Sequence, residues 1–218
     1  RGCFNTCAFC VSGGEKPVRT LSIEAIRERL QIIHQHGIKN VRVLDRTFNY
    51  NTRRAKELLE LFLEYHPDIR FHLEIHPALL SEELKEELKH LPEGLLHLEA
   101  GIQSLREPVL EKSRRMGKLT DALEGLKFLC SLPNMETHAD LIAGLPLYHL
   151  SEIFEDIRVL AAYGAGEIQL ESLKLLPGTE MRRRAEELGI QYSPLPPYEV
   201  LQTREINVSE LQTARQLS

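Results

Sequence analysis

Apolar residues along the chain follow a helical spacing and a strand spacing in turn. Helical spacing predicts helices over about 22–36, 53–65, 79–91, 119–131 and 150–163. Alternating or apolar runs between them predict strands over 40–45, 70–75, 95–100, 136–142 and 167–175. Strands that alternate with helices form parallel sheets covered by helices, so the pattern predicts an α/β fold, either doubly wound or wrapped into a barrel.

Four of the predicted strands have one polar and one apolar face. Residues of equal parity along a strand point the same way. If the apolar faces pack on the helices, the polar residues line the interior of a barrel and indicate a cavity for a charged ligand. The alternative is that these groups bond to one another or face solvent. They are His72, Glu74 and His76; His97 and Glu99, with Gln103 just beyond; His138 and Asp140; and Gln169 and Glu171.

The two ends of the chain differ from its middle. We assign residues 1–176 to the core and 177–218, with Pro194, Pro196 and Pro197 and a predicted helix over 208–217, to a C-terminal extension. The chain starts Arg-Gly-Cys without a preceding strand, so we expect the first strand of the fold to be truncated and the sequence to be a fragment.

Composition restricts the class of protein. The 218 residues are 42% hydrophobic and 27% charged, which suits one globular domain with a substantial core. The net charge is -5 and the basic residues are dispersed, so we do not expect a nucleic-acid partner. No apolar run approaches the roughly 20 residues that span a bilayer, so we expect a cytoplasmic protein without membrane contact.

Three of the four cysteines lie within the first ten residues, as Cys3-x-x-x-Cys7-x-x-Cys10. A chain of this size needs no disulfide framework, and no second Cys or His pair completes a structural zinc site. Three thiolates on one loop can instead bind three irons of a cubane cluster and leave the fourth iron open. Cys130 lies alone in an apolar helix, where we expect a buried small side chain.

Two other hypotheses remain open on these residues. The first is a metal-dependent hydrolase, in which His72, His76, His97 and Asp140 converge on zinc or iron inside the barrel. The second is a non-catalytic protein in which the cysteines hold a structural or electron-transfer cluster.

The cysteine spacing, with Phe9 directly before the last cysteine, resembles the signature of radical S-adenosylmethionine (SAM) enzymes. The resemblance extends over residues 1–176. Val-Leu-Asp-Arg-Thr-Phe-Asn at 43–49 is similar to a motif of members that have an upstream cobalamin-binding domain. Three later motifs, at 72–77, 98–104 and 140–146, are similar to those of the oxygen-independent coproporphyrinogen oxidases. The resemblance implies a partial (β/α)6 barrel.

The resemblance to radical SAM enzymes also implies a set of cofactors and of residues that bind them. The cofactors would be a [4Fe-4S] cluster on Cys3, Cys7 and Cys10, SAM, and cobalamin through a domain outside this chain, with flavodoxin or ferredoxin as electron donor and an unknown substrate. The Gly13-Gly14-Glu15 stretch follows the cysteines instead of the second strand, so we interpret it as a turn. By resemblance, SAM would contact Phe9 and Ile142 (adenine), Asp45 (amine), Glu74 and Gln103 (amine or ribose), Arg115 (carboxylate) and Asp140 (ribose).

Overall fold

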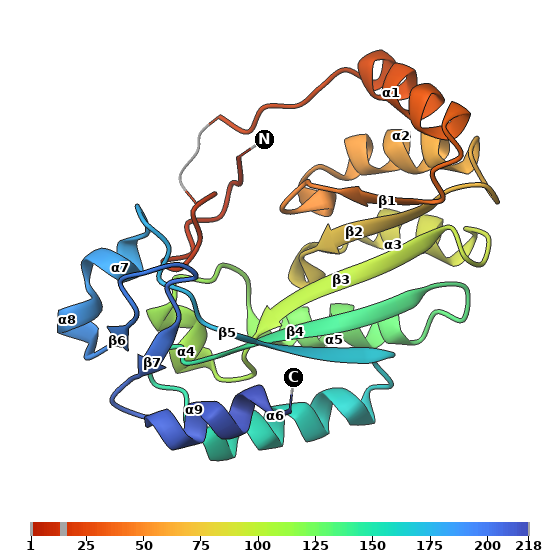
Figure 1. Cartoon of the computed structure of the whole chain (residues 1–218). Coiled ribbons are helices and arrows are strands. Elements are labelled where there is room, and N and C mark those ends of the chain that lie inside the picture. Colours follow the sequence, from red (N-terminus) through yellow and green to blue (C-terminus); the bar gives the residue numbers. More distant parts are fainter. Residues whose placement is uncertain (1, 14–16, 218) are drawn as a thin grey trace.

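A five-stranded parallel sheet forms the centre of the computed structural model, which describes residues 2–13 and 17–217 (Figure 1). The strands lie in chain order, β1-β2-β3-β4-β5, and each neighbouring pair is parallel. The predicted α/β fold with a parallel sheet is therefore confirmed. The strands are β1 (Asn40–Val43), β2 (Arg70–Ile75), β3 (Leu96–Gln103), β4 (Glu136–Ala143) and β5 (Glu167–Ser172).

Helices connect the strands, and three of them begin at a residue whose side chain caps the first turn. The side chains of Ser22, Asn51 and Ser81 accept hydrogen bonds from backbone N–H groups of the first turns of α1, α2 and α3, which satisfies donors that a helix start leaves free. The longer helices are α1 (Ile23–Gln35), α2 (Thr52–Leu63), α3 (Glu82–Lys89), α5 (Leu119–Cys130) and α6 (Leu150–Ala162).

The core lies between the apolar strand faces and the helices. Along β2, Phe71, Leu73 and Ile75 are buried, while the polar residues between them are only partly buried. The rings of Phe71 and Phe62 of α2 stack with centroids 4.0 Å apart. The same alternation holds in β3, so the apolar faces pack on the helices as the sequence predicts, and the polar faces are left for the interior.

Several short elements were not predicted from the sequence. They have too few residues to show a period. Strand ends also differ from the prediction: β1 ends at Val43 instead of 45, β3 continues to Gln103, and β5 ends at Ser172. The additional elements are η1 (Phe48–Tyr50), η2 (Pro77–Leu79), α4 (Glu107–Lys112), α7 (Glu180–Arg183), α8 (Ala185–Leu188), and the antiparallel pair β6 (Gln191–Tyr192) and β7 (Val200–Gln202).

The segment after β5 packs on the rest of the chain. Its last helix, α9 (Val208–Arg215), lies beside α6 (Figure 1). The backbone N–H of Val200 donates to the carbonyl of Leu173 at 2.9 Å, which joins β7 to the chain just beyond β5. The division into a core and an extension at residue 176 stays a prediction.

Among the described residues, no helix is both long enough and apolar enough to cross a membrane.

Candidate functional site

The cysteine loop is held by backbone hydrogen bonds from two distant segments. The N–H of Ala8 donates to the carbonyl of Ser113 at 2.9 Å, and the N–H of Met181 donates to the carbonyl of Ala8 at 2.8 Å. Gly13 lies against the loop, where an added Cβ would approach the carbonyl oxygens of Cys7 and Cys10 at 3.2 and 3.4 Å. A side chain at Gly13 would press on the loop; Gly14 and Glu15 of the predicted turn lie outside the described residues.

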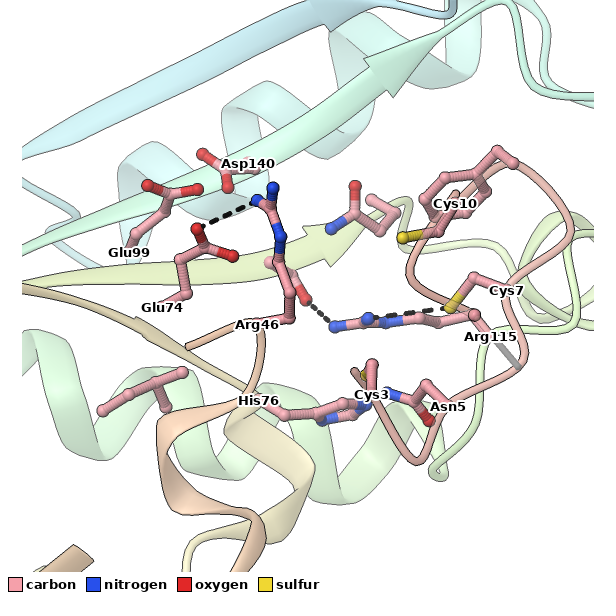
Figure 2. A pocket seen from close by; sticks show the side chains of 15 residues that line it. Cys3, Asn5, Cys7, Cys10, Arg46, Glu74, His76, Glu99, Arg115 and Asp140 are labelled. Carbon is pink, nitrogen blue, oxygen red and sulfur yellow. Dashed lines mark hydrogen bonds and ion pairs between the residues drawn. The ribbon is translucent and has the colours of Figure 1, made fainter. Parts of the chain in front are cut away.

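The three cysteines share a cavity of about 150 Å³ with polar side chains from the sheet. Figure 2 shows the cysteines on one side of this cysteine cavity and Glu74, Glu99 and Asp140 on the other. The sequence prediction that polar strand positions line an interior is thus confirmed for these three carboxylates. The lining also includes Asn5, Phe9, Gly13, Arg46, Ile75, His76, Gly101, Gln103 and Arg115.

The donor set of the cysteine cavity fits an iron-sulfur cluster. Cys3 and Cys7 are buried, and Cys10 is partly exposed. Burial raises the pKa of the Cys7 thiol, while the nearby Arg115 guanidinium, 3.9 Å from the sulfur, works against that rise. Asn5 is 2% exposed and neither polar atom of its amide has a hydrogen-bond partner among the described residues, which is consistent with a cavity built to hold another group.

Two carboxyl groups of the cavity are held in a low-dielectric setting. Burial raises the pKa of Glu74, although Arg46 forms an ion pair with it at 3.2 Å and works in the other direction. Burial also raises the pKa of Asp140, against a contact with His138. Buried carboxylates beside an arginine favour a ligand that brings hydroxyl or ammonium donors.

A β-bulge points Gln103 at the same cavity. The register of β3 with β4 shifts between Gly101 and Gln103. Gln103 has a φ of 73°, in the left-handed region that residues other than glycine rarely adopt. Arg115 donates from Nη2 to the carbonyl of Gly101 at 2.7 Å. The guanidinium of Arg115 therefore bridges the end of β3 and the cysteine loop.

Two predicted SAM ligands, Phe9 and Ile142, line a second cavity of about 230 Å³ that adjoins the first. Phe9, Cys10 and Arg46 line both cavities. The predicted adenine contacts thus lie together, next to the cavity that holds Glu74, Gln103, Arg115 and Asp140.

Asp45 lies apart from the other predicted SAM ligands. It lines a third cavity of about 310 Å³, which shares Cys3 with the cysteine cavity and is also lined by Thr47 and Arg54. Burial raises its pKa. The strand ends at Val43, so the chain turns before Asp45, and the next residue, Arg46, reaches the cysteine cavity instead. The structure does not bring Asp45 into the cysteine cavity.

Arg46, Asn5 and His76 are cavity residues to which the sequence prediction gave no role in SAM binding. Arg46 directly follows Asp45 in the motif at 43–49, so that motif could have indicated Arg46 as a site residue. Asn5 lies between the cysteines of the signature, and its burial is visible only in the fold. Cys130, at the end of α5, packs against the core but is only half-buried, whereas the sequence predicted a buried side chain.

The histidines proposed for a hydrolase do not all meet. The ring centroids of His72 and His97 are 4.8 Å apart. His76 comes four residues after His72, which corresponds to about 13 Å along an extended chain. His76 instead has Nε2 at 3.0 Å from the carbonyl of Met116. The four-residue hydrolase set, His72, His76, His97 and Asp140, is therefore not assembled among the described residues.

His76 predicts a dependence of stability on pH in the cluster-free chain. Burial, then the charge of Arg115, lowers the pKa of His76 to about 3. The unfolded chain takes up this proton near pH 6.5, so the free energy of unfolding falls as pH falls from about 6.5 to about 3, by about 1.4 kcal/mol per unit. Relative to His76→Gln, the wild type should lose about 2 kcal/mol between pH 7.5 and 5 in urea unfolding. Parallel pH profiles would contradict this.

The family model described as the radical SAM superfamily matches residues 1–160. The chain belongs to this superfamily, which uses a [4Fe-4S] cluster and SAM and whose curated relatives are enzymes.

Two curated relatives match parts of the chain. An uncharacterized methyltransferase of Pyrococcus horikoshii is 32% identical over 115 residues, covering 51% of this chain and 24% of the relative. A tRNA-2-methylthio-N(6)-dimethylallyladenosine synthase of Dehalococcoides mccartyi is 25% identical over 198 residues, covering 84% of this chain and 46% of the relative. The chain thus spans less than half the length of either.

Solved structures share the fold. The radical SAM methyltransferase TsrM of Kitasatospora setae has a TM-score of 0.73 at 20% identity, over 99% of this chain and 44% of that one. The coproporphyrinogen III oxidase HemN of Escherichia coli has a TM-score of 0.58 at 17% identity, over 87% and 51%. The resemblance to cobalamin-associated members and to coproporphyrinogen oxidases is confirmed, as is the partial barrel.

Proposed function

We propose that this chain binds a [4Fe-4S] cluster through Cys3, Cys7 and Cys10 and cleaves SAM reductively beside it. The observation that carries the proposal is the cysteine cavity, in which three thiols face carboxylates from neighbouring strands. When bound, such a cluster supplies one electron that splits the C5'–S bond of SAM into methionine and a 5'-deoxyadenosyl radical, which then takes hydrogen from a substrate.

The residues around the cysteines suit the parts of SAM. Arg115 offers a guanidinium to the methionyl carboxylate, and a planar fork matches a carboxylate well. Glu74 or Gln103 accepts from the amine, and Asp140 accepts from the ribose hydroxyls. Phe9 and the backbone of Ile142 would hold adenine in the second cavity, which adjoins the first. We assign no SAM contact to Asp45, because it lines a different cavity.

The electron and the later chemistry come from outside the described cavity. A low-potential protein donor such as flavodoxin or ferredoxin would reduce the cluster, and we propose a cytoplasmic location, where thiols stay reduced.

For the later step we propose methyl or methylthio transfer, the class named for the two curated relatives, with cobalamin bound by a further domain if the step is methylation. Release of S-adenosylhomocysteine would support methyl transfer from SAM.

Anaerobic reconstitution tests the proposal. The wild-type chain should bind about four irons with a broad absorbance near 400 nm and release 5'-deoxyadenosine from SAM under dithionite. Cys7→Ala should lose both, because a thiolate ligand is removed. Cys130→Ala is the matched control and should keep both, because Cys130 lies on α5, outside the cavity.

Two results would contradict the proposal. One is iron retained by the variant with Cys3, Cys7 and Cys10 all changed to alanine. The other is a full cluster in the wild type that releases no 5'-deoxyadenosine from SAM, which would favour a non-catalytic iron-sulfur protein.

A further inference from the structure

Side chains of three adjacent strands form a second cluster of potential ligands, which adjoins the cysteine cavity at Glu99. His72 of β2, Glu99 of β3 and His138 of β4 each offer one atom, and these three atoms lie within 4.8 Å of one another. Glu99 Oε2 is 2.7 Å from His72 Nε2 and 3.7 Å from His138 Nε2. The parallel register places Glu99 opposite His138, so the cluster follows from the sheet itself.

The ring of His138 is held so that its Nε2 faces the carboxylates of Glu99 and Asp140. Its Nδ1 lies 3.0 Å from His97 Nε2, a hydrogen bond that fixes the ring. Its Nε2 has no hydrogen-bond partner among the described residues, although the side chain is only 6% exposed. The atom lies 3.3 Å from Asp140 Oδ1, which is also buried without a hydrogen-bond partner.

His138 Nε2 and Asp140 Oδ1 form an ion pair only if both ring nitrogens of His138 carry a proton, and a metal ion can take the place of the proton on Nε2. If Nδ1 of His138 carries the proton and donates to His97, Nε2 presents a lone pair toward the oxygens of Glu99 and Asp140, which repel it. A positive ion between these atoms removes the repulsion. Metal-binding histidines show this arrangement, with the second ring nitrogen bonded to a fixed neighbour.

We propose that His72, Glu99 and His138 bind a divalent first-row transition metal ion, with His97 as the residue that orients His138. Two imidazoles and one carboxylate are a ligand set of zinc and of non-haem iron sites. Bonds of about 2.1 Å require ligand atoms about 3.3 Å apart, so side-chain rotations close the cluster without movement of the strands. The proposal uses none of the cysteines and does not rest on SAM cleavage, although Glu99 also lines the cysteine cavity.

Arg42 competes for the same carboxylate. Its guanidinium forms an ion pair with Glu99, but the Arg42 side chain is 56% exposed and can turn away into water. Arg42, His72 and His97 also line a basal cavity of about 290 Å³ at the start of the strands, together with Asn40, Val41 and Arg70. This basal cavity gives an ion a path to the cluster that avoids the cysteines.

Titration with Co²⁺ tests the site. In the full chain with Cys3, Cys7 and Cys10 all changed to alanine, one Co²⁺ should bind and give visible d–d bands without a thiolate charge-transfer band. Zn²⁺ should displace it. Glu99→Gln and His138→Asn should weaken binding at least tenfold, and His97→Gln about 10–100-fold.

Two further variants separate a metal site from general effects of charge or folding. His34→Asn changes an exposed histidine that pairs with Asp68 and should leave Co²⁺ affinity unchanged. Arg42→Gln should tighten binding about two- to fivefold, because it removes a competing cation from Glu99.

Circular dichroism checks the fold of each variant. If the triple cysteine variant does not fold, the wild-type chain replaces it, because the charge-transfer band identifies any Co²⁺ on thiolates. Absence of a Co²⁺ spectrum without thiolate character, or undiminished affinity in Glu99→Gln and His138→Asn, would overturn the proposal. Neither result would affect release of 5'-deoxyadenosine, so failure of this site and failure of the proposed function are distinguishable.

Discussion

Replacing Asp156 with alanine is expected to lower the free energy of unfolding by about 3–5 kcal/mol, the range for loss of one partner from a buried ion pair. Asp156 lies on α6 and is 1% exposed. Its carboxylate accepts hydrogen bonds from the N–H of Leu105 at 2.8 Å, the hydroxyl of Tyr148 at 2.6 Å and Nε of Arg106 at 3.0 Å. One acidic group thus ties α6 to the loop after β3.

The large effect follows from what the substitution leaves behind. Tyr148 is fully buried, and burial together with the Asp156 charge raises its pKa far enough to keep the hydroxyl a donor. Without Asp156, this hydroxyl, a backbone N–H and part of a guanidinium lose their acceptor inside the protein, where each unsatisfied group costs about 1–3 kcal/mol.

Glu155→Ala is the matched control for Asp156→Ala. Glu155 pairs with the same Arg106 at 2.7 Å but is 58% exposed, so its loss should cost less than about 1 kcal/mol. Urea unfolding followed by circular dichroism at neutral pH measures both variants. Equal losses for the two would show that burial of Asp156 does not matter.

The sheet was predictable because its central strands, β2 and β3, alternate buried apolar residues with partly buried polar ones. Phe71 and Leu73 alternate with His72 and Glu74, and a shift of one residue would have placed the charges in the core. The grouping of Cys3, Cys7 and Cys10 was predictable for another reason: they lie on one loop, so their spacing in sequence is close to their arrangement in space. Local patterns of this kind can be recognised in the sequence before the fold is known.

The arrangement of the site that strand periodicity could not give depends on where strands end, bend and pair. The resemblance placed Asp45 among the SAM ligands, but β1 stops at Val43 and Arg46 enters the cysteine cavity instead. Gln103 points into the cavity because of a bulge with a positive φ, which no periodicity signals. His138 and Glu99 meet because β3 and β4 pair in one register, a long-range relation that the sequence does not state.

Asp156 illustrates the same limit for stability. On a helix, an aspartate usually faces solvent, and nothing in its neighbours along the chain distinguishes it from Glu155. Only the packing of α6 against the loop after β3 buries one carboxylate and exposes the other. Side-chain chemistry was therefore predicted best where its partners are close in sequence.

Gly125→Ala is expected to lower the free energy of unfolding by about 2–4 kcal/mol, although helix propensity alone predicts a gain of about 1 kcal/mol. Gly125 lies in the interior of α5. A Cβ built there would lie 2.1 Å from the carbonyl oxygen of Pro77, the first residue of η2. Since both atoms belong to the backbone or are fixed to it, α5 or η2 must move as a unit.

The displacement would reach the candidate site, because η2 follows directly after His76 at the end of β2. Thermal unfolding of Gly125→Ala measures the loss, and Gly166→Ala is the control, since its added Cβ would lie 3.5 Å from the carbonyl oxygen of Thr137, an ordinary contact. The control should stay within about 1 kcal/mol of the wild type. A Gly125→Ala variant as stable as the wild type would mean that α5 can move away from η2 and that propensity outweighs the contact.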